Sequence, residues 1–216
     1  MTIEQLTIEH MRVILVVYIS AIGPLLLIPF LLKKKLIPSW VPVVYLASFV
    51  ACAVGWELWF TYGWLDGAPV YERRSEVLNT YLPYHLNWLL NSLADAGSIC
   101  LGGILLLHII LGGTSSHLNQ WRWSAFFILL TWFIGQNVFV EMFLYHDQLA
   151  VGKALSWAPL APTGPWFNPI LFEFKGRTIT LQGQLPWLIM TPLFYAVLIR
   201  YQKIGDARPQ KIIAGP

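Results

Sequence analysis

Residues 85–111, HLNWLLNSLADAGSICLGGILLLHIIL, decide the fold because they are long and apolar enough to cross a lipid bilayer as one helix. At about 1.5 Å per residue, such a helix exceeds the roughly 30 Å of a bilayer's hydrocarbon core. The stretch contains one acidic residue, Asp95. A charge near the bilayer centre costs about 2.5 to 3.5 kcal/mol by the lowest scales, so Asp95 indicates a functional site.

Four further stretches have the same apolar character, and together they predict spans at 12–32, 41–64, 85–111, 123–145 and 185–201. The composition agrees, since 56% of the residues are hydrophobic and only 12% are charged. Five spans and their connections use the whole chain. We therefore expect an all-α polytopic membrane protein, a five-helix transmembrane bundle that forms a single domain over residues 1–216.

Lysine and arginine residues predict the orientation of the bundle. Eight of them fall on one side: Lys33, Lys34, Lys35, Arg122, Arg200, Lys203, Arg208 and Lys211. The positive-inside rule makes that side cytoplasmic, so the N-terminus is expected outside or in a lumen and the C-terminus in the cytoplasm. The net charge of +3 is thus a topology signal, and without a basic stripe that contains aromatic residues no nucleic acid is expected as a partner.

Polar residues repeat at helical spacing in the third and fourth spans. Asn87, Asn91 and Asp95 recur every four residues, and so do Asn137 and Glu141, so each set lies on one face of its helix. Polar faces in lipid turn toward other helices. The spacing therefore predicts a polar cavity between the spans.

The depth of these residues places the predicted cavity in the outer half of the membrane. The residues expected around it are Glu57, Asn87, Asn91, Asp95, Gln136, Asn137 and Glu141. Two structural alternatives remain open. Glu57 and Glu141 are close enough to the interface to be solvated there, and the amides could link helices by hydrogen bonds of about 0.6 kcal/mol each.

The connection over residues 146–184 is too long for a simple turn and is expected to form a lid over the cavity. It is rich in proline and tryptophan: Trp157, Pro159, Pro162, Pro165, Trp166 and Pro169. Within it, residues 170–181 alternate around Lys175 and Gly176, which predicts an extramembrane β-hairpin. Two strands alone are marginally stable, so the hairpin is expected to pack over the mouth of the cavity.

Other chemistries lack a supporting pattern. Glu141 and His146 have the wrong spacing for the Glu-x-x-His pairs of di-iron proteins. His85 and His146 could bridge a haem near the outer end, but isolated histidines there are usually only hydrogen-bonded. Cys52 and Cys100 lie in apolar spans and are expected to be small buried side chains. With no phosphate-binding glycine motif, we expect neither a metal nor a cofactor.

Four short segments suggest a family. They are Glu57 in Glu-Leu-Trp-Phe-Thr-Tyr, Asp95 ahead of Gly102 and Gly103, Gly135-Gln136 ahead of Glu141, and Trp187 ahead of Pro192. In this order they resemble motifs of the EXPERA family, the group of the emopamil-binding sterol isomerases. One position departs from the family, because Ala53 stands where the isomerases have a histidine one turn before the glutamate.

The resemblance implies that the four later spans form the family's four-helix unit and that the first is an additional helix. The implied chemistry is protonation of an alkene to a carbocation, followed by removal of a proton elsewhere. Glu57 and Asp95 would form the proton-transfer pair, because a carboxyl group withdrawn from water can donate while a second one accepts. Trp187 would bind the substrate and stabilise the cation through its π face.

The segments Trp56-Glu57 and Asp95-Ala-Gly-Ser-Ile-Cys are also similar to motifs of integral-membrane terpene cyclases, which have more helices. We therefore expect a membrane-embedded isomerase or cyclase whose substrate is a hydrophobic isoprenoid or sterol-like lipid of the bilayer. The alternative is a non-enzymatic sterol-binding or lipid-trafficking protein, which Ala53 favours. A third class, proton or ion translocation, needs a polar path, but the inner halves of the spans are apolar apart from His108.

Overall fold

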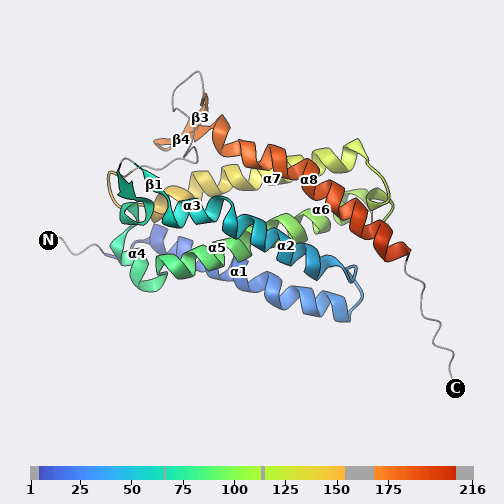
Figure 1. Cartoon of the computed structure of the whole chain (residues 1–216). Coiled ribbons are helices and arrows are strands. Elements are labelled where there is room, and N and C mark those ends of the chain that lie inside the picture. The colour runs from blue at the N-terminus through green and yellow to red at the C-terminus, as the bar shows by residue number, and fades with distance from the viewer. Residues whose placement is uncertain (1–4, 66, 113–114, 154–167, 208–216) are drawn as a thin grey trace.

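The computed structural model describes residues 5–65, 67–112, 115–153 and 168–207, and most of them are helical (Figure 1). Within these residues, four helical segments are long and apolar enough to cross a membrane: Ile8–Lys33, Val41–Tyr62, Tyr84–Leu111 and Trp123–Gln148. They coincide with the first four predicted spans. The prediction of a multi-pass helical protein is therefore confirmed at this level.

Three of the four segments change their helical geometry along their length. The first is a single helix, α1 (Ile8–Lys33). The others are built from shorter pieces: α2 (Val41–Val54) and α3 (Trp56–Tyr62); α5 (Tyr84–Gly97), the π-helix η2 (Ser98–Gly102) and α6 (Gly103–Leu111); and α7 (Trp123–Val140), the π-helix η4 (Glu141–Tyr145) and the 3-10 helix η5 (His146–Gln148). Such π-helical turns occur frequently at functional sites, because they redirect the side chains that follow.

The fifth predicted span, 185–201, lies within helix α8 (Leu181–Asp206), which packs along α7 (Figure 1). This helix is 26 residues long, but it is not among the four segments that are apolar enough to span. Polar side chains near its two ends, Gln182 and Gln184 at the beginning and Arg200 and Lys203 toward the end, lower its mean hydropathy. The count of five transmembrane helices therefore stays a prediction, because α8 has the length of a span but not its hydropathy.

Helix α5 packs against both α1 and α2, which gives it a central place in the bundle. Gly97 allows the close approach of α5 to α1, because a Cβ there would collide with the ring of Pro24. Gly103 does the same for α6 and α7, since a Cβ on it would lie 3.0 Å from a methyl group of Leu129. Cys52 and Cys100 are fully buried in the same core, as the sequence predicts.

Two connections cover one end of the bundle. Between α3 and α5 the chain forms the short strands β1 (Trp64–Leu65) and β2 (Ala68–Pro69), the 3-10 helix η1 (Val70–Arg73) and helix α4 (Glu76–Tyr81). This connection is tied to the end of the fourth segment, because the Ser75 amide donates to the Gln148 carbonyl at 3.0 Å and the Ala150 amide to the Arg73 carbonyl at 2.8 Å.

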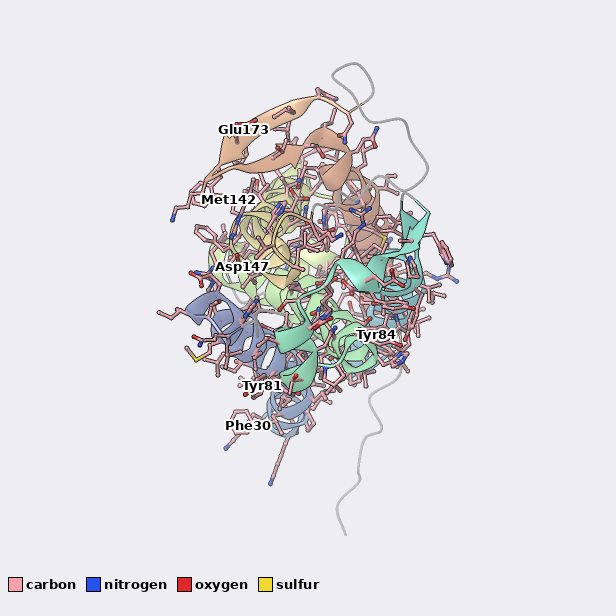
Figure 2. All side chains as sticks on the ribbon, turned by 90° about the vertical axis from the view of Figure 1, so that its left-hand side faces the viewer. Phe30, Tyr81, Tyr84, Met142, Asp147 and Glu173 are labelled. Carbon is pink, nitrogen blue, oxygen red and sulfur yellow. The ribbon has the colours of Figure 1, made fainter. Side chains whose placement is uncertain are left out.

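The predicted hairpin is confirmed as strands β3 (Ile170–Phe174) and β4 (Arg177–Thr180), which pair antiparallel. Its turn uses Lys175 and Gly176 at φ values of 50° and 73°, the left-handed region that glycine tolerates best. Asp147 forms ion pairs with both Arg12 and Arg177, so it joins α1, η5 and β4 at this end of the bundle (Figure 2).

Parts of two sequence predictions lie outside the described residues. They are the middle of the predicted lid, with Trp157, Pro159, Pro162, Pro165 and Trp166, and the two last basic residues, Arg208 and Lys211.

Candidate functional site

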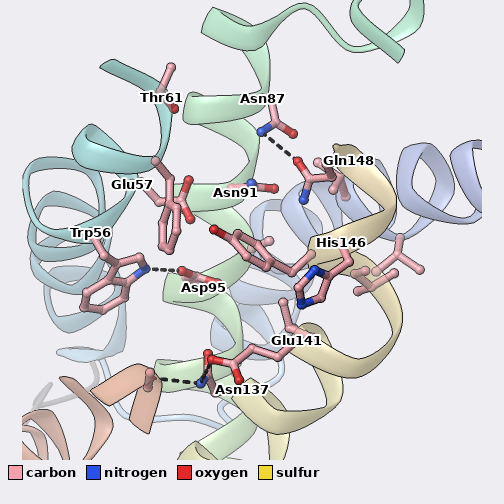
Figure 3. Close-up of a pocket in the computed structure, with 18 of the residues that line it drawn as sticks. Trp56, Glu57, Thr61, Asn87, Asn91, Asp95, Asn137, Glu141, His146 and Gln148 are labelled. Atoms are coloured by element: carbon pink, nitrogen blue, oxygen red, sulfur yellow. Dashed lines mark hydrogen bonds between the residues drawn. The ribbon is translucent and has the colours of Figure 1, made fainter. Parts of the chain in front are cut away.

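A cavity of about 330 Å³ lies between the helices, toward the end that the two connections cover. All the candidate residues from the sequence line it: Glu57, Asn87, Asn91, Asp95, Gln136, Asn137, Glu141 and Trp187. The predicted convergence of three carboxylates from separate helical segments is therefore confirmed (Figure 3).

Asp95 on α5 accepts a hydrogen bond from the indole of Trp56, with 2.7 Å between Nε1 and Oδ2. Trp56 directly follows Gly55, where the helix breaks between α2 and α3. A Cβ on Gly55 would lie 2.5 Å from the carbonyl oxygen of Ala51, so only glycine fits there. The ring of Trp56 also packs against Trp187 at a centroid distance of 5.1 Å, so aromatic faces border the Asp95 carboxylate.

Glu57 follows Trp56 directly and is 7% exposed. Its Oε2 is buried and has no hydrogen-bond partner within the described part of the chain. Asn91 lies beside this carboxylate, and Asp95 lies one helical turn further along α5 (Figure 3). A buried carboxylate oxygen that faces a cavity without a partner is available to a ligand, either for a hydrogen bond or for a proton.

Glu141, by contrast, is held by amide side chains on both oxygens. Asn137 donates to Oε1 at 3.2 Å and Gln184 donates to Oε2 at 3.3 Å. Asn137 also donates to the Gln184 side chain at 2.9 Å, which joins α7 to α8. Gly183 permits this approach, because a Cβ there would collide with the Glu141 carboxylate.

Gln136 borders the cavity at the point where η2 packs against α7. The hydroxyl of Ser98 donates to Gln136 Oε1 at 3.5 Å, and Gln136 Nε2 donates to the carbonyl of Phe133 at 3.2 Å. The indole of Trp132 donates to the carbonyl of Ser98 at 2.9 Å. These contacts fix the π-helical turn that carries Ser98 to the cavity wall.

Arg74 is a buried cation at the cavity wall. Its guanidinium donates to the side chains of Asn79 and Gln148, both at 2.7 Å, and to the carbonyl of Leu82 at 2.9 Å. Burial lowers the pKa of Arg74 to about 10, and the nearby negative charge of Glu57 opposes that decrease. Arg74 therefore stays protonated at neutral pH and compensates carboxylate charge in the cavity.

Two further polar atoms face this part of the cavity without a partner among the described residues. Asn87 donates to Gln148 Oε1 at 3.3 Å, but its own Oδ1 is buried and unpaired. The buried hydroxyl of Tyr145 is unpaired as well, and it lies within electrostatic reach of Glu141 and Glu57. Together with Glu57 Oε2, these atoms leave the cavity wall able to hydrogen-bond a ligand.

Sequence reasoning missed Arg74, Tyr145 and Gln148 because none of them continues a polar stripe on a helix. Arg74 and Gln148 lie on connections that fold back over the end of the bundle. No local sequence pattern predicts that these connections reach the cavity. Tyr145 had been taken as the last residue of its span. The π-helical turn η4 places it in the wall instead.

The histidines do not form a pair across the cavity. His146 lines it, whereas His85 is hydrogen-bonded to the hydroxyl of Tyr62 at 2.8 Å and lies outside the lining. Among the described residues, no group of three or more His, Cys, Asp and Glu side chains is arranged to hold a metal ion. The site consists of carboxylates, amides and aromatic rings, and it suits acid-base chemistry or binding.

None of the protein-family models, curated proteins and solved structures compared with the chain matches it.

Proposed function

We propose that the chain is a multi-pass membrane enzyme, an isomerase or cyclase, that transfers protons to and from an isoprenoid or sterol-like lipid. One observation carries the proposal: Glu57 and Asp95 line the same buried cavity between helices that are apolar enough to cross a membrane. Two acids at such a place are costly unless they have a task, and a donor and an acceptor are what proton transfer needs.

The hydrogen bonds suggest which of the two carboxyl groups donates a proton and which accepts one. Glu57 has a free oxygen toward the cavity and would donate a proton to a carbon of the C=C bond, which leaves a carbocation on the neighbouring carbon. Asp95, oriented by the Trp56 indole, would accept a proton from an adjacent carbon and so re-form a double bond. In a cyclase, a second C=C bond of the same substrate would attack the cation before that proton is lost. Neither route needs an oxidant or a reductant.

Aromatic rings support a cationic intermediate in this proposal. Trp187 lines the cavity, is 4% exposed and packs against Trp56. The face of a tryptophan ring attracts a cation, by about 2 kcal/mol or more when water is excluded. Glu141, which is fully hydrogen-bonded to amides, would act as a positioning residue that holds α7 against α8.

We further propose that α8 is a fifth span and that the end with the basic residues is cytoplasmic. At about 1.5 Å per residue, its 26 residues are long enough to cross, and Phe194 and Leu198 are buried along it. Trp40, just after the three consecutive lysines, packs against Tyr201 at 6.2 Å, so basic segments gather at one end. The cavity lies toward the other end, because residues of η1 and η5 line it, and α1 begins at that end (Figure 1).

The second candidate function is non-enzymatic binding or trafficking of a sterol or related lipid. Ala53 favours it, since the isomerases of the resembled family have a histidine at this position. Here Ala53 is buried, and its carbonyl accepts a hydrogen bond from the indole of Trp88 at 2.9 Å. A binding protein would keep its lipid when the acids are neutralised, and it would convert nothing.

The testing experiment is mass spectrometry of lipids that copurify with the protein in mild detergent, followed by incubation of the enriched lipid with the protein in heavy water. We expect a sterol or polyprenyl compound that acquires deuterium, and no deuterium uptake with Glu57→Gln or Asp95→Asn. Lipid retention without deuterium uptake in any variant would favour the binding function. Enrichment of bulk phospholipid alone would contradict both.

A further inference from the structure

A second hollow lies on the outside of the bundle, between α6 and α7, and it touches the cavity. Its lining on α7 includes Phe127, Thr131, Gly135 and Phe139, which recur every four residues and so form one stripe along the helix. Two small side chains thus lie between two phenylalanines. From the first to the last, the stripe extends about 18 Å at 1.5 Å per residue.

The walls of this groove are apolar and face away from the bundle. Leu106 and Ile110 on α6 form the opposite side, and Ile110, Phe127 and Phe139 are each more than half exposed. Helices α6 and α7 both belong to segments apolar enough to span a membrane. In a bilayer such a groove is filled by hydrocarbon chains.

The groove and the polar cavity share a wall. Gln136 and Phe139 line both, whereas Gly135, Thr131 and Phe127 line the groove and not the cavity. Gln136 is held in this wall by its hydrogen bonds to Ser98 and Phe133, and the apolar side chain of Phe139 forms the rest of the wall. Phe139 is exposed and packs against Phe143 at a ring distance of 4.9 Å.

We propose that the α6–α7 groove binds the apolar chain of the substrate and that the substrate enters from the bilayer through it. The reacting end of the substrate then lies in the cavity, beyond Gln136 and Phe139. This inference rests on the proposed function and narrows its substrate class to an elongated, flexible lipid such as a linear isoprenoid. A compact lipid confined to the cavity would make no use of the groove.

Gly135 offers a direct test because it lines the groove and a Cβ on it meets no atom within 4 Å, so a larger side chain can begin there without a collision and occupy part of the groove. Leucine is also a better helix former than glycine, so Gly135→Leu is expected to fold. Gly23 on α1 is the matched control: its Cβ position is equally open, and it lines neither the cavity nor the groove.

The experiment uses the full chain in phosphatidylcholine vesicles with two photoreactive probes, a C20 and a C10 linear isoprenoid alcohol, each with a diazirine at the tail. We expect the C20 probe to label groove residues of α6 and α7, in competition with unlabelled C20 alcohol. Gly135→Leu should reduce this labelling at least tenfold and leave labelling of cavity residues by the C10 probe unchanged. Gly23→Leu should match the unaltered protein with both probes.

Two results would overturn the groove proposal: C20 labelling that is insensitive to Gly135→Leu, or adducts spread evenly over all lipid-exposed faces, as a diazirine-labelled phosphatidylcholine would give. Failure of the proposed function would look different. In that case Glu57→Gln and Asp95→Asn would leave deuterium uptake by the copurified lipid unchanged, whatever the labelling of the groove.

Discussion

The three acids of the cavity differ in their hydrogen bonds, and at the scale of single residues this difference separates their roles. Glu57 has an unpaired oxygen, Asp95 accepts from one indole, and Glu141 accepts from two amides. A carboxylate that is saturated by rigid partners contributes to architecture, whereas one with a free oxygen can act on a ligand. The same substitution should therefore have different effects at the three positions.

Glu57→Gln should abolish turnover and leave folding intact. The amide keeps the shape of the side chain and removes the transferable proton, so the rate should fall by about 10² to 10⁴. The thermal midpoint should stay the same, because the amide and the protonated carboxyl group are both neutral and have similar shapes. Deuterium uptake by the lipid and a thermal melt in the same detergent check both parts. If the rate falls together with the melting temperature, the loss of activity reflects lost stability, and this result would contradict the role of Glu57 as proton donor.

Glu141→Ala should mainly destabilise the protein. It leaves the amide donor of Gln184 without its acceptor, which costs about 1 to 3 kcal/mol for a buried group left unpaired, whereas Asn137 keeps the Gln184 side chain and the Gly183 carbonyl as acceptors. Thermal unfolding followed by circular dichroism measures the loss. Val151→Ala, at a position that is 93% exposed, is the control and should not change the midpoint. An unchanged midpoint in Glu141→Ala would contradict a stabilising role for the hydrogen bonds of Glu141 with Asn137 and Gln184.

At the scale of the elements, the breaks in the helices aim side chains into the cavity. Gly55 separates α2 from α3, and the π-helical turns η2 and η4 carry Ser98 and Tyr145 to the wall. A straight helix in any of these places would turn its polar groups to another face. The interruptions are therefore part of the site.

Gly55→Ala should disturb the site from outside it. The new Cβ would lie 2.5 Å from the carbonyl of Ala51, so the chain must shift and move the Trp56 indole away from Asp95. We expect turnover to fall at least tenfold with the helix content unchanged. The readouts are deuterium uptake and far-ultraviolet circular dichroism. Gly23→Ala, with open space at its Cβ, should have no effect, and equal activity of both variants would refute this role of the break.

Asp147→Asn should loosen the β3–β4 hairpin. Asp147 is buried and pairs with Arg12 and Arg177, which are 40% and 21% exposed in their side chains. Because water screens these partners, we expect a loss of about 2 kcal/mol, below the 3 to 5 kcal/mol of fully buried pairs. Hydrogen exchange of β3 and β4 should accelerate, while exchange in α5 stays slow. Uniform acceleration in both would contradict a local role.

The sequence predicted the elements whose signal is local. Four spans follow from hydropathy, and the hairpin follows from alternation around Lys175 and Gly176. The inward face of α5 follows from the spacing of Asn87, Asn91 and Asp95, and that of the fourth segment from the spacing of Asn137 and Glu141. It did not predict α4, η1 or the break at Gly55, because short helices depend on tertiary contacts for their stability. For the same reason Arg74, which η1 and α4 bring to the cavity, could not be found from its neighbours.

At the scale of the whole molecule, the polar cavity lies toward one end of the bundle, and the basic residues predicted to be cytoplasmic lie toward the other. Those within the described residues are Lys33, Lys34, Lys35, Arg122, Arg200 and Lys203. This asymmetry predicts the orientation in the membrane. The native cysteines help to test it, since Cys52 and Cys100 are fully buried and should not react with an impermeant reagent. Single exposed cysteines can then report the side of each connection.

Lys34→Cys and Lys203→Cys should be protected from a membrane-impermeant maleimide in intact cells, and Glu72→Cys should be labelled. All three positions are exposed on the protein, so accessibility depends on the side of the membrane. Labelling of all three after permeabilisation is the control. If position 203 is labelled on the same side as position 72, then α8 returns without crossing and the fifth span is wrong.

The partition formed by Gln136 and Phe139 has a consequence for how such a protein could diversify. Because Gly135, Thr131 and Phe127 contact the groove and not the cavity, substitutions there would change the preferred chain length of the substrate and leave the acids untouched. Changes around Arg74 and Asn87 would alter the recognised end group and leave the chain length untouched. The preferred chain length and the recognised end group of the substrate could then be changed independently by substitution.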